Sequence, residues 1–228
     1  MVLMARKKVS DRKRSRPIEK RKKITIVTKN KIMVIFIVAI LIISAIATIA
    51  ITLSNNSKEE GSPYAVIDTT KGTIVVELFE DKAPITCENF IKLANDGFYD
   101  GLIFHRIKDN FMIQAGKSYP DGSQKVSPYG TIEFEGDGNH VDGAISMAST
   151  DAGVGGSAEF FICDGAQSSL DGNYAAFGAV TENIEVVRDI ADEPHDESLE
   201  PTPEDPYRPG GGKPLNDITI NSIVIEYR

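Results

Sequence analysis

The sequence is poor in cysteine, since its 228 residues contain only Cys87 and Cys163. Two cysteines are too few to define a disulfide framework, although a single bridge between them stays possible. No cysteine follows the apolar run at residues 32–53, so attachment through a lipidated cysteine there has no residue to use. The chain also lacks a periodic repeat, which argues against a repeat architecture.

Positive charge is scarce beyond residue 31. Residues 1–31 carry 13 Lys and Arg against Asp11 and Glu19, a balance of +11, so residues 32–228 must carry −19 to give the total of −8. An acidic surface repels phosphate groups, and no nucleic-acid partner is expected for this larger part. The basic segment itself could bind nucleic acid, but a basic run beside an apolar helix is more often a topology and anionic-lipid signal.

Residues 32–53 lack charge altogether. This run of 22 residues would span roughly 33 Å as a helix, and the hydrocarbon core of a bilayer is about 30 Å thick. The sequence therefore predicts a single transmembrane helix in the cell membrane. A cleaved signal peptide is the alternative, but its apolar region is usually only ~7–15 residues long. The basic block favours a cytoplasmic N-terminus and an extracytoplasmic C-terminal part.

Beyond this run, residues 54–63 are polar and predict a spacer before a domain at residues 64–228. Proline and acidic residues are concentrated at 192–214, which predicts a long irregular insertion within that domain. Helical spacing of apolar residues predicts two helices, at 84–96 and 183–191. Alternation of apolar and polar residues predicts strands at 64–68, 73–79, 103–107, 111–114, 132–135, 143–148, 159–163, 175–180 and 218–227.

This pattern predicts a mainly β fold. About eight strands with frequent turns favour a closed eight-stranded antiparallel barrel, because closure removes the exposed edges of a sheet. The two α-helices would cap the barrel. A β-sandwich with both helices packed on one side is the alternative.

One stretch, FHRIKDNFMIQAG at residues 104–116, places Arg106 and Gln114 among apolar side chains. By itself it fits an arginine on a solvated strand as well as a functional site. It is followed by GAISMAS at 143–149, GSAEFFI at 156–162 and LDGNYAAFG at 170–178. In this order the four segments resemble the cyclophilins, the cyclophilin-type peptidyl-prolyl cis-trans isomerases, and the anchor predicted above indicates a membrane-anchored, bacterial-like form.

The resemblance implies an eight-stranded antiparallel barrel capped by two helices, and a rotamase that accelerates Xaa-Pro isomerisation in folding exported proteins. Its catalytic residues would be Arg106 and Gln114. No covalent bond is broken in such a rotation, so no cofactor and no metal are expected. The expected partners are proline-containing polypeptides, with the membrane contacted through residues 32–53 and the protein a monomer. The substrate-binding residues that the resemblance implies are Phe111, Met112, Ala148, Ser149, Glu159, Phe161, Leu170 and Tyr174.

Four positions depart from the usual cyclophilin pattern. Glu159 stands where Gln is most common, Tyr174 where His is common, Ser169 where many members have Trp, and Lys117 where Asp is usual. Glu159 is expected near Arg106, and a direct pair would steady the guanidinium but divert part of its donor capacity. Replacing Glu159 by Gln would then raise turnover or change its pH dependence. Lys117 is expected to face solvent, and Ser169 predicts weak sensitivity to cyclosporin.

Other functions are open at this point. A proline-peptide binding module or holdase chaperone would use the same site with little catalysis. A hydrolase based on Cys163 or a serine is a more distant alternative, because nothing in the sequence lowers the pKa of that thiol. His105 is expected to be structural, since the rotation transfers no proton. Aspartates in glycine-rich turns could suggest calcium loops, but their spacing fits no EF-hand: Asp137, Asp142, Asp151, Asp164 and Asp171.

Overall fold

The computed structural model describes residues 61–203, 205 and 210–228, together with Val34, Ile40, Ile42 and Ser44. The predicted basic segment at 1–31 lies outside the described residues, as do nearly all of the predicted transmembrane run at 32–53 and most of the predicted spacer. Among the residues described, no helix is both long enough and apolar enough to cross a membrane. The transmembrane prediction thus rests on the sequence.

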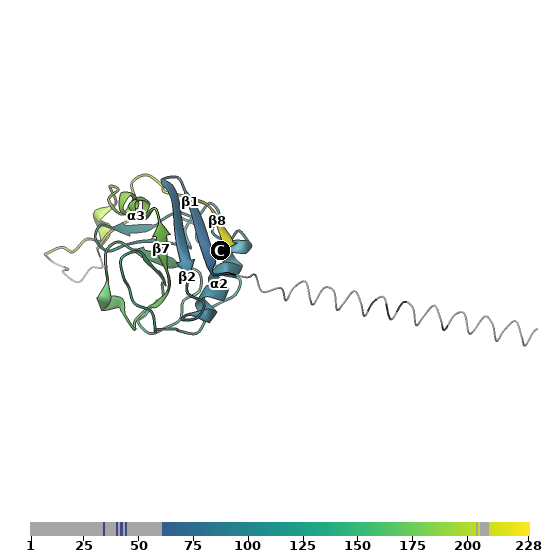
Figure 1. Ribbon diagram of the computed structural model, residues 1–228. Coiled ribbons are helices and arrows are strands. Elements are labelled where there is room, and N and C mark those ends of the chain that lie inside the picture. Colours follow the sequence, from purple (N-terminus) through teal and green to yellow (C-terminus); the bar gives the residue numbers. More distant parts are fainter. Residues whose placement is uncertain are drawn as a thin grey trace, which may run out of the picture. The chain divides into compact units, whose positions relative to one another are not determined.

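An antiparallel sheet of eight strands forms the domain, in the order β3-β4-β6-β5-β7-β2-β1-β8. The first strand begins one residue earlier than predicted, at Pro63. Figure 1 shows β7, β2, β1 and β8 side by side across the near face. The strands are β1 (Pro63–Thr69), β2 (Gly72–Leu78), β3 (Arg106–Lys108), β4 (Met112–Ala115), β5 (Ala144–Met147), β6 (Phe160–Cys163), β7 (Ala175–Glu182) and β8 (Ile220–Tyr227).

The predicted closed barrel is wrong, because the sheet is an open half-barrel. Within the described ranges its two end strands, β3 and β8, form no ladder with each other. Irregular backbone covers the edge of β3 instead: the N–H of Ile107 donates to the carbonyl of Gly212 at 2.9 Å, and that of Phe104 donates to Ile218 at 3.0 Å. Residues 210–219 thereby satisfy the backbone groups that a neighbouring strand would have paired.

Within residues 61–203 and 210–228, two α-helices lie at opposite ends of the half-barrel, as predicted (Figure 1): α2 (Pro84–Asn95) and α3 (Ile184–Ala191). Helix α2 begins with a proline, which is well suited to the first helical turn. The ring of Phe90, on this helix, is fully buried. It packs against the rings of Tyr99, Phe160 and Phe177 at centroid distances of 5.2, 5.5 and 5.2 Å. This aromatic cluster anchors the helix to strands β6 and β7.

Residues 132–135, predicted as a strand, have no regular secondary structure. One of these residues, Glu135, caps helix α2. The carboxylate of Glu135 accepts hydrogen bonds from the backbone N–H groups of Ile85 at 3.1 Å and Thr86 at 2.7 Å. Ala83, at the N-cap, has no side chain that could do this. A distant carboxylate therefore satisfies the free N–H groups at the start of the helix.

The predicted insertion at 192–214 is irregular where it is described, apart from the short 3-10 helix η2 (Glu197–Leu199). Its last part runs beside β3, where Gly212 and Ile107 exchange backbone hydrogen bonds. A Cβ atom on Gly211 would collide with the carbonyl oxygen of Ile107 on β3, and one on Gly212 would collide with the carbonyl oxygen of Asp196 within the insertion. Only glycine at position 211 allows the insertion to pass this close to the strand.

Candidate functional site

The hairpin of β3 and β4 brings Arg106 and Gln114 together. These two residues are directly opposite each other in the antiparallel register, so their side chains project from the same face. The Nη1 atom of Arg106 lies 3.5 Å from Oε1 of Gln114. The turn between the strands contains Asn110 with a left-handed backbone, φ 56°, which asparagine tolerates better than most residues. The sequence predicted strands at 103–107 and 111–114, one on each side of this turn.

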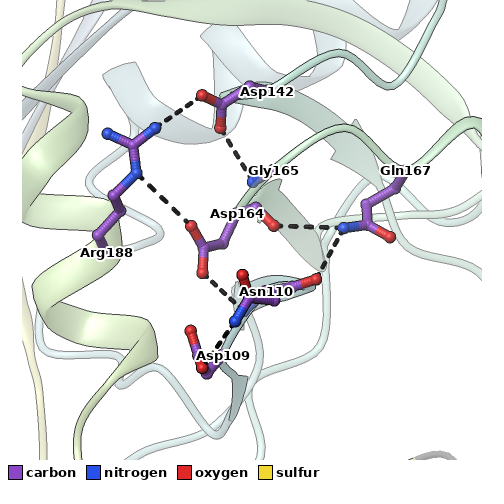
Figure 2. Close-up of polar contacts among 7 residues, drawn as sticks. All are labelled: Asp109, Asn110, Asp142, Asp164, Gly165, Gln167 and Arg188. Carbon is purple, nitrogen blue, oxygen red and sulfur yellow. Dashed lines mark hydrogen bonds and ion pairs between the residues drawn. The ribbon is translucent and has the colours of Figure 1, made fainter.

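Polar contacts hold this turn from the outside, as Figure 2 shows. The carboxylate of Asp164 accepts a hydrogen bond from the N–H of Asn110 at 2.8 Å, and Gln167 donates its amide to the carbonyl of Asn110 at 3.0 Å. Arg188 on α3 pairs with Asp142 at 2.7 Å. Two aspartates that could have suggested a calcium loop are thus engaged with protein donors, which fix the loops around the site.

A cavity of about 130 Å³ opens beside the hairpin. Strands β3, β4 and β6 and the loops that follow β5 and precede β7 contribute its walls. Of the ten predicted site residues, only Glu159 is missing from its lining. The residues around the cavity are Arg106, Phe111, Met112, Gln114, Ala148, Ser149, Phe161, Leu170 and Tyr174.

Phe161 forms the rigid wall of this cavity. Its ring stacks on His140 at 5.8 Å with an interplanar angle of 10°, and it meets the edge of Tyr174 at 5.8 Å. His140 is buried and held on both sides, by Asp171 at 2.9 Å and by Ser146 at 3.0 Å. Hydrogen bonds from His140 lower the pKa of the Asp171 carboxyl, so the anion that orients the imidazole is maintained.

The order Asp171, His140, Ser146 has the connectivity of a hydrolase triad, but the serine cannot reach a substrate. Ser146 has 0% exposed surface. Cys163 also has none, and burial, assisted by nearby carboxylates, raises the pKa of its thiol to about 12. Cys163 and Cys87 are both free, so the bridge that the sequence left open is not formed. Neither Ser146 nor Cys163 therefore supports the hydrolase alternative.

Arg106 is held by the insertion as well as by the hairpin. Its Nε and Nη2 atoms donate to the carbonyl of Gly210 at 3.1 and 2.9 Å, and its guanidinium carbon lies 5.8 Å from the ring centre of Phe111. Burial lowers the pKa of Arg106, while the nearby groups Tyr174, Glu200 and Glu159 act in the opposite direction. An arginine remains a cation under these conditions. The guanidinium is therefore fixed in its plane at the rim of the cavity.

Glu159 reaches Arg106 through Gln114, in place of the direct pair considered from the sequence. Its Oε1 atom accepts from Nε2 of Gln114 at 2.5 Å and lies 2.9 Å from Nε2 of His105. Its Oε2 atom pairs with the ammonium of Lys117 at 2.8 Å. Lys117, which was expected to face solvent, has a side chain that is 36% exposed and also pairs with this carboxylate at the edge of the site. Next to Gln114, the negative charge of Glu159 is thus balanced by the positive charge of Lys117.

A second cavity of about 390 Å³ adjoins the first. The two share Gln114, Ala148 and Ser149, so together they form a continuous groove across the end of β4 and the loop after β5. Lys117 and Glu159 lie on the side of the second cavity. Ala148 and Ser149, which the resemblance implies as substrate-binding residues, thus line both cavities.

Comparison with known proteins agrees with this geometry. The family profile described as "Cyclophilin type peptidyl-prolyl cis-trans isomerase/CLD" matches residues 64–223. The chain belongs to the cyclophilin family. It is thus a cyclophilin-type peptidyl-prolyl cis-trans isomerase, and the resemblance carried by the four sequence segments is confirmed.

Several relatives cover most of the cyclophilin domain. A peptidyl-prolyl cis-trans isomerase of Synechococcus elongatus is 43% identical over 129 residues, which are 55% of this chain and 87% of the relative. The peptidyl-prolyl cis-trans isomerase-like 3 of Gallus gallus is 36% identical over 164 residues, 70% of this chain and 93% of that protein. The crystal structure of a Cryptosporidium parvum cyclophilin superposes with a TM-score of 0.62 at 29% identity, covering 74% of this chain and 99% of that one.

Two supports of this cyclophilin site were missed from the sequence. His140 lies in an acidic, glycine-rich stretch, and Gly210 belongs to the insertion, so neither stood out as part of a site. Nothing local to either residue indicates that it touches a pocket wall or an arginine, because both contacts join segments far apart in the chain. Ser169, where many cyclophilins have tryptophan, is exposed and lies outside the lining of both cavities.

Proposed function

We propose that this cyclophilin accelerates Xaa-Pro isomerisation in exported polypeptides, with Arg106 stabilising the twisted amide. The observation that carries the proposal is the cavity itself, which combines one fixed guanidinium with an apolar wall of Phe111, Met112 and Phe161. A crystal structure of the Cryptosporidium parvum cyclophilin was determined in the presence of the dipeptide Ala-Pro, and it superposes on this chain with a TM-score of 0.61. That relative supports a proline-containing peptide as the substrate here.

Rotation about a peptide bond faces a barrier of about 18–20 kcal/mol, because the C–N bond has partial double-bond character. In the twisted state amide resonance is lost and the prolyl nitrogen regains a lone pair. A donor from Arg106 interacts more strongly with this nitrogen than with the planar amide of either isomer. Such a difference between transition state and ground state is what acceleration requires.

Arg106 alone does not account for a large acceleration. A ten-thousandfold gain needs roughly 5.5 kcal/mol, whereas one hydrogen bond to a charged group contributes about 1.5–3 kcal/mol. The apolar wall supplies a second contribution, since it holds the proline ring while the preceding carbonyl rotates. Burial of the guanidinium edge supplies a third, because excluding water strengthens the charged interaction.

A binding module with weak catalysis is the second candidate. The observation in its favour is that Nε and Nη2 of Arg106 already donate to the carbonyl of Gly210. If these donors are the ones needed for the twisted amide, the site binds proline peptides without accelerating their rotation.

Exchange NMR on an Ala-Pro peptide distinguishes the two candidates. With catalytic amounts of the full-length protein we expect cis and trans resonances to exchange many times faster than the uncatalysed tens to hundreds of seconds. A protease-coupled assay on the same peptide provides an independent rate. Peptide binding, seen as shifts of the peptide resonances without faster exchange, would instead establish the binding module and contradict the enzymatic proposal.

The location of the domain is proposed from the sequence: residues 32–53 would anchor the chain in the cell membrane, with the catalytic domain outside. Because Cys87 and Cys163 are buried, a cysteine introduced elsewhere would be the principal reactive thiol. In intact cells a membrane-impermeant maleimide should label Ser57→Cys and leave Ser10→Cys unlabelled until the cells are opened. Labelling of both positions, or only of Ser10→Cys, would contradict this orientation.

A further inference from the structure

The side-chain amide of Gln114 lies between a carboxylate and a guanidinium. Its nitrogen Nε2 is 2.5 Å from Oε1 of Glu159, and its oxygen Oε1 is 3.5 Å from Nη1 of Arg106. An amide has a donor end and an acceptor end of nearly the same shape, so a half-turn about its last bond exchanges the two. The chemistry of the neighbours therefore decides which end faces Arg106.

Glu159 makes this choice unambiguous. An ionised carboxylate can only accept hydrogen bonds and a guanidinium can only donate them. With Nε2 facing Glu159 and Oε1 facing Arg106, both contacts of Gln114 are satisfied, and a half-turn would break both at once. We infer that Glu159 is a positioning residue, which orders Arg106 by fixing the orientation of the Gln114 amide. This inference rests on the proposed role of Arg106.

The surroundings of Glu159 keep it ionised. Burial acts to raise the pKa of this carboxyl, but hydrogen bonds from His105 and Lys117 outweigh it and leave the pKa below its ordinary value. The two cationic or donor partners approach from the two sides, with His105 on Oε1 and Lys117 on Oε2. The carboxylate is thus an acceptor on both oxygens, as the orientation of Gln114 requires.

His105 supplies a second constraint on the same oxygen. Since Glu159 only accepts, Nε2 of His105 must carry the proton of that contact. Its other nitrogen, Nδ1, is buried and has no hydrogen-bond partner among the residues that the structure describes. The imidazole therefore donates its Nε2 proton to Glu159, which agrees with the structural role expected for it.

A glutamine at position 159, with a donor and an acceptor of its own, would accept either orientation of Gln114.

The effect on catalysis has the opposite sign from the one expected for a direct pair. If Glu159 withdrew donors from Arg106, the substitution Glu159→Gln would raise turnover. Because it orders Arg106 through Gln114, we expect Glu159→Gln to lower kcat about three- to tenfold, the size of one well-oriented hydrogen bond. KM should change less than about twofold, since the apolar wall that holds proline is untouched.

Glu226→Gln is the matched control. It makes the same exchange of a carboxylate for an amide at an exposed position of β8, where Glu226 pairs with Arg228 at 2.7 Å. In proton–nitrogen NMR spectra of the full-length protein, the side-chain amide resonances of Gln114 are assigned from their disappearance in Gln114→Leu. We expect Glu159→Gln to shift and broaden these resonances, while Glu226→Gln leaves them sharp and kcat within about twofold of the parent.

A double-mutant cycle completes the test. In the Gln114→Leu background the further change Glu159→Gln should have no additional effect on kcat, because the two residues act in series. Additive losses, an unchanged or higher kcat in Glu159→Gln, or an unmoved Gln114 resonance would each overturn the inference. The position and width of the Gln114 resonance are measured without substrate, so they do not depend on the catalytic rate. A failure of the proposed role of Arg106 would appear as full activity in Arg106→Ala, whatever the Gln114 resonance shows.

Discussion

Replacing Arg106 by alanine is expected to lower kcat/KM about ten- to hundredfold. The size follows from the loss of one charged hydrogen bond to the twisted amide, about 1.5–3 kcal/mol. Arg106→Lys should recover only part of the activity, because a single ammonium cannot replace a planar guanidinium that contacts Gly210 and Gln114 at once. Exchange NMR at several peptide concentrations separates kcat from KM in both variants.

Arg228 provides the matched control for this experiment. It lies just after β8, is 41% exposed, and pairs with Glu226 at 2.7 Å and with Glu182 at 3.0 Å. Surface pairs of this kind contribute about 0–1 kcal/mol to stability. Arg228→Ala should therefore remove the same charge from the chain and leave kcat/KM unchanged. Equal losses in the two alanine variants would show that net charge, and not the position of Arg106, sets the rate.

The second large effect is expected at Phe161. Phe161→Ala removes the wall on which proline would pack, an apolar contact of about 1.5–3 kcal/mol, so kcat/KM should fall about ten- to hundredfold. The loss should appear chiefly in KM, because the wall contacts the substrate ring before and during the rotation. Peptide titration by NMR gives the dissociation constant directly, and affinity unchanged from the parent would contradict a role for this ring in binding.

The neighbouring residue in the chain is the control. Phe160 points to the opposite face of β6, where it is fully buried against Phe90 and Tyr99. Phe160→Leu should lower the free energy of unfolding by up to about 1.5 kcal/mol, seen as a lower midpoint of urea unfolding, and leave kcat/KM of the folded protein intact. Of these two adjacent residues on β6, Phe160 would thus contribute to stability and Phe161 to substrate binding.

The regular elements could be predicted from the sequence because their patterns are local. Helix α2 repeats buried residues such as Phe90 and Leu93 at helical spacing, and the hairpin from Arg106 to Gln114 carries its own turn residue, Asn110. The alternation at 132–135 was equally strong, yet this segment is no strand, because its Glu135 is drawn to the start of α2. Local alternation does not reveal which distant group a side chain will satisfy.

The closure of the barrel and the support of the arginine depend on long-range contacts. Whether β3 meets β8 is decided by the path of residues 210–219, and alternation within either strand says nothing about it. For the same reason the contact between Arg106 and Gly210 was missed. The lining of the cavity was accessible from the sequence, since the four segments that resemble cyclophilins contain all of it. The sequence showed that Glu159 departs from the usual cyclophilin pattern, but it did not show which side chains this carboxylate contacts.

The order of strands has a consequence for biosynthesis. β1, the first strand of the domain, lies between β2 and β8, the last of the described strands. A growing polypeptide therefore cannot finish this sheet until residue 227 has left the ribosome, and one edge of β1 stays unpaired until then. A protein proposed to assist the folding of other chains would itself spend most of its synthesis as an incomplete sheet, exposed to proteases and to pairing with its neighbours.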